Sequence, residues 1–187
     1  RALLVLGVLM FSKFVYLASM TNYYTFYLID SFGVSVERAQ HFLFIFLFAS
    51  TIGTILGGPV GDRWGRKIVI WISILGVAPF SLALPHVDML ACGVLSAGAG
   101  LILASAFSAI LVYAQEMIPG RVGLVGGLFF GSAFGMAALG AAVLGKVADE
   151  TSIRFVFNLC GYLPLLGFLA VFLPDVDRRS RHASVSR

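Results

Sequence analysis

Long apolar runs, separated by short charged connections, constrain this chain more than any other feature. A membrane helix needs about 20 apolar residues, and six runs approach or exceed that length: 3–29, 39–60, 68–84, 89–113, 122–147 and 153–173. Only 12% of the 187 residues are charged, too little polar surface to cover a soluble fold. The ten-residue alternation that a membrane β-barrel requires is absent. The chain is therefore predicted to be an all-α integral membrane protein, with a six-helix transmembrane bundle over residues 1–174.

The cations divide unequally between the two ends of such a bundle. Six spans place both ends of the chain on one side of the membrane. Nine cations fall on that side, namely Arg1, Arg63, Arg66, Lys67, Arg121, Arg178, Arg179, Arg181 and Arg187, against Arg38, Lys146 and Arg154 on the other. By the positive-inside rule both ends are expected to be cytoplasmic. The polar residues 175–187 are predicted to form a disordered basic tail.

Lys13 is the charged residue at the centre of the first span. It lies about 15 Å along the helix from Leu3, close to mid-bilayer, where a cation is costly and usually faces a cavity or a partner. At about 100° per residue, one helix face carries Lys13, Tyr16, Met20, Tyr23, Tyr24 and Tyr27. This face is predicted to line a substrate pathway for an anionic or aromatic ligand. The alternatives are that Lys13 reaches the interface or pairs with an acid outside this chain, and that the tyrosines are interfacial anchors.

Other polar groups in the spans carry weaker signals. Ser105 and Ser108 share a face of the fourth span and are further pathway candidates, although membrane serines often bond to their own helix backbone. No acid falls at mid-membrane. A proton-coupled transporter would therefore use a carboxylate outside this chain, or Lys13 itself would exchange the proton. The histidines and cysteines lack metal-ligand spacing, so no metal or cofactor is expected, and the low charge argues against a nucleic-acid partner.

Small residues recur every four positions on the second and fifth spans. The rows are Ala49, Gly53, Gly57 and Gly61, and Gly123, Gly127, Gly131 and Gly135. Residues four apart share one helix face, and small side chains there let another backbone approach closely. Two interpretations stay open: the rows pack helices within this bundle, or both face a partner that slides or rocks against it. Pro79 and Pro164 lie within spans and are expected to kink them.

The stretch GPVGDRWGRK, residues 58–67, concentrates four charges between glycines. It resembles the loop signature of the major facilitator superfamily, G-x-x-x-D-R-x-G-R-[RK]. Every fixed position matches: Gly58, Asp62, Arg63, Gly65, Arg66 and Lys67. The segments FSKFVYLAS, YYTFYLI, ILASAFSAILVYAQEMIPGRVG, GLFFGSAFGMAALGAAVLG and PLLGFLAVFLPD further resemble the C-terminal half of the bacterial fosmidomycin-resistance exporters.

The resemblance implies a twelve-helix fold of which this chain is helices 7–12, with a missing N-terminal six-helix half as partner. It implies export of a small drug-like substrate, a fosmidomycin-type phosphonate, across the bacterial inner membrane by alternating access. The proton gradient would supply the energy. The glycine rows on helices 8 and 11, with Gly53, Gly57, Gly123, Gly127, Gly131 and Gly135, would be seams against the other half.

The resemblance also implies a conformational switch at the inner surface. The expected members are Gly58, Gly61, Asp62, Arg63, Gly65, Arg66, Lys67, Glu116 and Arg121. The carboxylate of Asp62 would face a helix N-terminus of the other half and latch the outward-facing state. Arg63 or Arg66 would pair with Glu116 within this half. A plain topogenic turn is the alternative.

Other function classes fit less well. A major facilitator transporter of a different small molecule is the first alternative, and a free-standing six-helix channel or assembly protein is the second. Membrane phosphotransferases that bind metal through aspartates four residues apart are disfavoured, because Arg66 follows Asp62 at that spacing. No enzymatic activity is expected.

Overall fold

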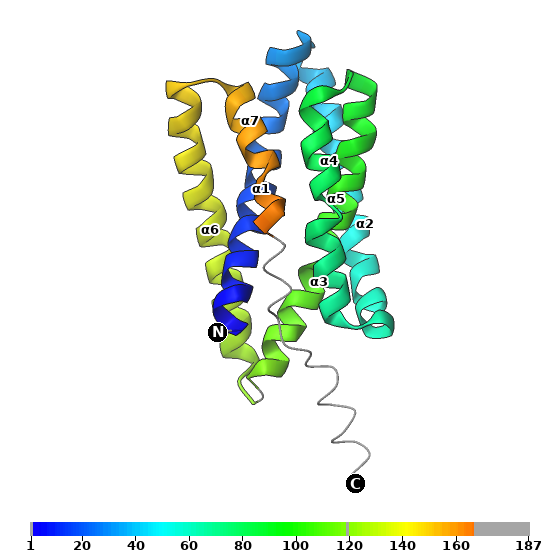
Figure 1. Cartoon of the computed structure of the whole chain (residues 1–187), viewed down its shortest axis with the longest axis vertical. Coiled ribbons are helices and arrows are strands. Elements are labelled where there is room, and N and C mark those ends of the chain that lie inside the picture. The colour runs from blue at the N-terminus through cyan, green and yellow to red at the C-terminus, as the bar shows by residue number, and fades with distance from the viewer. Residues whose placement is uncertain (1, 119, 167–187) are drawn as a thin grey trace.

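Helices make up the regular structure of residues 2–118 and 120–166, the part of the chain that the computed structural model describes (Figure 1). The elements are α1 (Ala2–Phe32), α2 (Val36–Trp64), α3 (Arg66–Leu75), α4 (Ala78–Ala83), the 3₁₀ helix η1 (Leu84–His86), α5 (Met89–Met117), α6 (Val122–Glu150) and α7 (Ile153–Gly161). No strand occurs among these residues. The predicted all-α class is confirmed.

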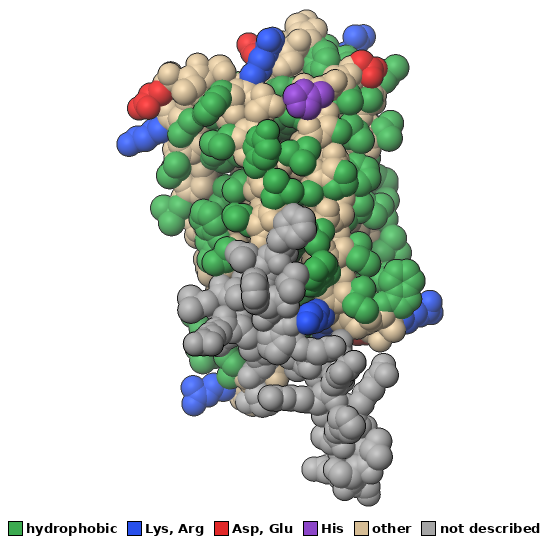
Figure 2. Space-filling view, in the orientation of Figure 1, with side chains coloured by type: hydrophobic (Ala, Val, Ile, Leu, Met, Phe, Trp, Pro, Cys, Tyr) green, Lys and Arg blue, Asp and Glu red, His purple; other side chains and the backbone are tan. Residues whose placement is uncertain are grey.

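The helices run along the long axis of the molecule and reverse direction at each main connection (Figure 1). Charged side chains gather at the two ends, and hydrophobic side chains cover most of the visible surface between them (Figure 2). Four described stretches are long and apolar enough to cross a membrane: Val36–Trp64, Arg66–His86, Met89–Glu116 and Val122–Glu150. Helix α1 has 31 residues, about 46 Å at 1.5 Å per residue, which also exceeds the hydrocarbon thickness.

The third predicted span, 68–84, is a single path with a break in its helix. The break lies at Gly76 and Val77, between α3 and α4. Pro79 has no N–H to donate to the carbonyl of Leu75, so the ladder of backbone hydrogen bonds is interrupted there. A similar change follows α7, where residues 163–166, including Pro164, form a 3₁₀ turn.

The central position of α1 determines where its polar residues lie. From Leu9 to Met20 every side chain of α1 is buried except Phe11 and Leu17. Helices α2, α5, α6 and α7 all contact α1. Most side chains in the middle of α1 therefore contact other helices of this chain.

Two aromatic clusters hold α1 in place. Toward the end that carries Arg63 and is predicted to be cytoplasmic, the inner end, the rings of Phe14, Phe107 and Phe129 meet edge to face, with centroids 5.5–6.2 Å apart. Toward the outer end, Tyr27 stacks on Phe157 of α7 at 4.2 Å between ring centroids. Such pairs add about 0.5–1.5 kcal/mol each beyond their buried area, so both halves of α1 are anchored.

Several predictions fall outside the described residues. They are the end of the sixth span (167–173), the basic tail (175–187), and the cations Arg1, Arg178, Arg179, Arg181 and Arg187.

Candidate functional site

Lys13 lies in the interior of the bundle, at the interface of α1 with α3. Its side chain is only 5% exposed. Nζ donates a hydrogen bond to Ser73 Oγ at 3.3 Å, and Ser73 Oγ donates onward to the carbonyl of Ile70 at 3.0 Å. An ammonium group has three N–H donors. Two of them therefore lack a partner among the described residues, in a region where an unsatisfied polar group is costly.

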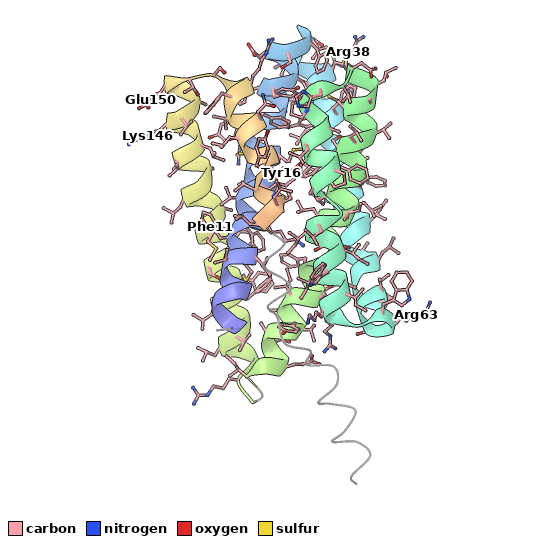
Figure 3. All side chains as sticks on the ribbon, viewed as in Figure 1. Phe11, Tyr16, Arg38, Arg63, Lys146 and Glu150 are labelled. Carbon is pink, nitrogen blue, oxygen red and sulfur yellow. The ribbon has the colours of Figure 1, made fainter. Side chains whose placement is uncertain are left out.

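The aromatic face predicted around Lys13 exists, but it is closed in this structure. Tyr16, Met20, Tyr24 and Tyr27 are each at most 3% exposed, and Tyr16 lies at mid-height within the bundle (Figure 3). The Tyr24 hydroxyl donates to the carbonyl of Cys92 on α5 at 3.2 Å. Half-buried Tyr23 donates to the carbonyl of Ala141 on α6 at 2.6 Å. These side chains pack inside this chain, and their contact with a substrate stays a prediction.

The two serine candidates on α5 behave differently. Ser105 Oγ donates to the carbonyl of Ile102 at 2.7 Å, which is the backbone bond that the alternative interpretation describes. The hydroxyl of Ser108 is buried and has no hydrogen-bond partner in the described part of the chain. Ser108 is therefore the stronger candidate of the two, because a buried hydroxyl without a partner is unfavourable until one is supplied.

The predicted inner-surface switch is assembled around Arg66. The guanidinium of Arg66 pairs with the carboxylate of Glu116 on α5 and lies 3.8 Å from Asp62 on α2. Gly65 has φ +92°, a conformation that favours glycine, and it turns the chain from α2 into α3. The sequence predicted that Arg63 or Arg66 pairs with Glu116, and in the structure Arg66 forms this pair.

The remaining switch residues surround this pair at the inner surface. Gly61 is buried, and a Cβ there would be within 3.8 Å of Ala109, whereas Gly58 has open space beside it. Arg63 is exposed and Lys67 is half-buried. Arg121 is exposed at the start of α6. The latch role of Asp62 stays a prediction, since it concerns a helix outside this chain.

The two glycine rows differ in what they face. A Cβ at Gly53 or Gly57 would overlap the backbone carbonyl of Leu101 or Ser105 on α5. These glycines thus pack α2 onto α5 within this bundle, which corrects the expectation that they face the other half. On α6, Gly123, Gly127, Gly131 and Gly135 are exposed, and a Cβ at each would meet nothing within 4 Å.

A polar strip on α1 was missed from the sequence. Thr21, Asn22 and Thr25 lie within about 100° on the helix, roughly opposite the tyrosine face. Asn22 is exposed, and its amide nitrogen donates to the carbonyl of Ala18 at 2.8 Å, while its amide oxygen accepts no hydrogen bond from a described residue. The signal available in the sequence was the amide of Asn22 within the first span. Lys13 and the tyrosines on the opposite face of the helix gave the stronger signal.

A cavity opens at the inner end of the same side of the bundle. It has a volume of about 320 Å³ and lies between α1, α5 and α6, where Met10, Phe129, Ser132 and Met136 contribute to its lining. A second cavity of about 240 Å³ is wholly apolar and is lined by residues of α1, α6 and the α7 region, including Phe11 and Leu139. The first cavity lies at the lower end of the range of about 300–1,000 Å³ that is typical of ligand pockets, and the second lies below it. Within the described ranges, no group of three His, Cys, Asp or Glu side chains could hold a metal ion.

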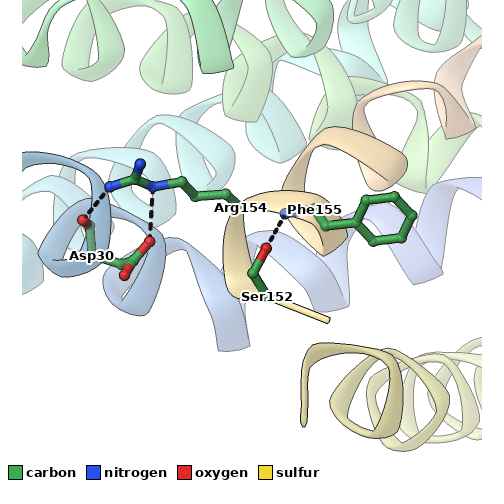
Figure 4. A network of polar contacts seen from close by, with 4 residues as sticks. All are labelled: Asp30, Ser152, Arg154 and Phe155. Atoms are coloured by element: carbon green, nitrogen blue, oxygen red, sulfur yellow. Dashed lines mark hydrogen bonds and ion pairs between the residues drawn. The ribbon is translucent and has the colours of Figure 1, made fainter. Parts of the chain in front are cut away.

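The outer end is held by an ion pair between α1 and α7 (Figure 4). Arg154 Nε lies 2.8 Å from Asp30 Oδ2, and another nitrogen of the same guanidinium donates to the carbonyl of Asp30. Ser152 caps α7 by accepting a hydrogen bond from the backbone N–H of Phe155 at 3.1 Å. Both ends of this bundle therefore carry one arginine that joins two helices.

Comparison of the sequence with known proteins finds a matching family and several relatives. Residues 5–187 match the family model described as Major Facilitator Superfamily. The chain is 62% identical over 174 residues to the "Fosmidomycin resistance protein" of Escherichia coli (strain K12), covering 93% of this chain and 43% of that protein. It is 45% identical over 161 residues to the "Uncharacterized MFS-type transporter YfnC" of Bacillus subtilis (strain 168), covering 86% and 39%.

A more distant relative carries a different name. The chain is 31% identical over 158 residues to the "4-hydroxybenzoate transporter PcaK" of Acinetobacter baylyi, covering 81% of this chain and 34% of that protein. The chain thus spans less than half the length of each of these relatives.

Proposed function

The chain belongs to the major facilitator superfamily and is a multi-pass membrane protein, and from this premise we propose that it forms helices 7–12 of a secondary transporter. The whole protein exports a small anionic drug, a fosmidomycin-type phosphonate, from the bacterial cytoplasm. The observation that carries the proposal is the 62% identity to a protein named for fosmidomycin resistance. No chemical catalysis and no cofactor enter the proposal.

Lys13 is the anion-binding residue in this proposal. A phosphonate offers several acceptor oxygens and negative charge, and Lys13 has two N–H donors beyond the one engaged with Ser73. Charge-assisted hydrogen bonds are the strongest available in a low-dielectric site. Binding requires α1 and α3 to separate enough to admit the ligand, so the closed arrangement described above is one state of a cycle.

Transport proceeds by alternating access between two six-helix halves. The N-terminal half, outside this chain, covers the exposed glycine row of α6, where small residues permit close approach and sliding. The described acids of this chain, such as Asp30, Asp62 and Glu116, lie near helix ends. The proton that drives export is therefore carried by a carboxylate of the other half or by Lys13.

The proposed location is the bacterial inner membrane, with both ends of the chain in the cytoplasm. The support is the excess of cations at the end that carries Arg63, Arg66, Lys67 and Arg121.

The whole protein, expressed in a drug-sensitive bacterium, tests the proposal. The expected result is resistance to fosmidomycin together with lower intracellular accumulation of the drug. Resistance without lower accumulation, or neither effect in cells where membrane insertion is verified, would overturn it. Lower accumulation of 4-hydroxybenzoate in place of fosmidomycin would favour the alternative of another substrate.

A further inference from the structure

The turn between α2 and α3 carries two cations, Arg63 and Lys67, that are in no ion pair with a described residue. Arg63 lies in the last turn of α2, and Lys67 lies in the first turn of α3. Neither forms an ion pair with a described residue, whereas Arg66 between them is paired with Glu116 and lies near Asp62. Asp62 is the nearby carboxylate that could oppose an anion here, and it shares Arg66 with Glu116, so the three cations and two carboxylates at this turn leave a net charge of +1.

An exposed tryptophan lies between these cations. Trp64 is 64% exposed. Tryptophan is enriched where hydrocarbon meets headgroups, because its ring is amphipathic and its N–H can bond to polar groups. Arg63 points away from the bundle at the same end (Figure 3). The turn therefore presents an indole and two cations at the level of the membrane surface.

A column of exposed apolar residues leads from this turn toward the bilayer centre. Ile52, Leu56, Pro59 and Arg63 follow one another at helical spacing on a single stripe of α2, and all four are exposed. From Ile52 to Arg63 the stripe is about 16 Å long, close to one leaflet of a hydrocarbon core about 30 Å thick. On α3, Ile68 and Ile72 form a second exposed column that begins beside Lys67.

We propose that the inner end of the α2–α3 hairpin binds an anionic phospholipid of the cytoplasmic leaflet. The phosphate lies between Arg63 and Lys67, Trp64 contacts the glycerol region, and the acyl chains follow the two apolar columns. Charge complementarity selects this occupant: the net charge of +1 at the turn matches the single negative charge of a phosphodiester, and apolar side chains continue from it for the depth of one leaflet. The proposal does not depend on the transported substrate.

Phosphatidylglycerol and phosphatidylcholine, titrated separately onto the purified whole protein in detergent, are the probes. Native mass spectrometry measures how much of each lipid stays bound. We expect phosphatidylglycerol to be retained preferentially. The variant Arg63→Gln with Lys67→Gln should weaken its retention about 25-fold, since each cation near the surface contributes about fivefold.

Arg121→Gln is the matched control, because Arg121 is an exposed cation at the same end of the bundle but on α6. It should leave phosphatidylglycerol retention unchanged. Equal retention of the two lipids by the parent protein, or equal loss in Arg121→Gln, would overturn the proposal. If the double variant does not fold, the parent protein and Trp64→Leu are compared instead. Equal retention of the two lipids by the parent, together with unchanged phosphatidylglycerol retention in Trp64→Leu, would contradict the lipid-binding proposal.

Discussion

At the residue scale, Lys13 combines a mid-span position with incomplete hydrogen bonding. Its single hydrogen bond to Ser73 leaves two N–H donors of the ammonium group without a described partner inside the bundle. This arrangement destabilises the fold, so a charged residue here indicates a functional role. A residue retained for packing alone would be replaced by an apolar side chain of similar length without loss.

The first prediction follows from this position. In the whole protein, Lys13→Met should abolish resistance to phosphonate drugs while membrane abundance stays similar, because methionine keeps the length and removes the charge. Lys13→Arg should retain some activity if charge alone matters. Lys146→Met, at the outer end of α6, is the control and should export normally. Normal export by Lys13→Met would exclude Lys13 as the anion or coupling site.

The second prediction concerns Asn22. Its amide oxygen has no partner in the described part of the chain, so we expect one from the substrate or from the other half. Asn22→Leu should insert as well as the parent and lower export severalfold, measured as drug accumulation in cells. Asn158→Leu is the control, since Asn158 is also exposed but lies on α7. Equal export by the two variants would remove the case for the strip.

Sequence reasoning predicted the depth and the face of Lys13, but not its partner. Helical spacing fixes the angle between Lys13 and Tyr16, because both lie on α1. It says nothing of which helix covers that face, and Ser73 is 60 residues away. The polar strip was missed for a related reason: a single helix offers two polar faces, and only the packing of neighbours tells which one is closed.

At the scale of elements, the glycine rows of α2 and α6 have the same spacing and different roles. The α2 row brings its backbone onto α5, while the α6 row is uncovered. The spacing predicts close approach in both cases, but the identity of the approaching helix depends on the fold. Likewise, hydropathy predicted the third span as one segment, and Pro79 explains its break into α3 and α4.

The third prediction separates these roles. Gly57→Ala should lower the stability of the purified protein by about 1–3 kcal/mol, because the methyl group overlaps the Ser105 carbonyl. Gly127→Ala should lower stability by less and should impair transport, because the space beside Gly127 is open within this half and is proposed to close against the other half. The opposite order of stabilities would refute this assignment.

At the scale of the whole molecule, the ion pairs at the two ends join helices rather than stabilise them strongly. Arg154 and Asp30 are about half exposed, and exposed pairs contribute about 0–1 kcal/mol. A conformational role needs no more than that, since about 1 kcal/mol shifts a two-state ratio about fivefold. The Arg66–Glu116 pair and the neighbouring Asp62 therefore suit a switch between inward-facing and outward-facing forms.

The fourth prediction tests this switch by thiol labelling in membranes. Asp62→Asn should insert normally, populate inward-open forms and export poorly, so that a cysteine placed at the cytoplasmic cavity mouth labels faster than in the parent. Glu116→Gln should act in the same direction. The native Cys92 and Cys160 are buried, which keeps the background low. Unchanged labelling with unchanged export would leave the loop as a plain topogenic turn.

The central claim is that this chain is half of a transporter in which a proton gradient drives export of a phosphonate drug through Lys13. The most direct measurement is uptake of labelled fosmidomycin into proteoliposomes that hold the purified whole protein and have an acidic interior. We predict uptake against the drug gradient, collapse of that uptake when a protonophore dissipates the pH gradient, and no uptake by Lys13→Met. Uptake that ignores the pH gradient, or that persists in Lys13→Met, would contradict the claim.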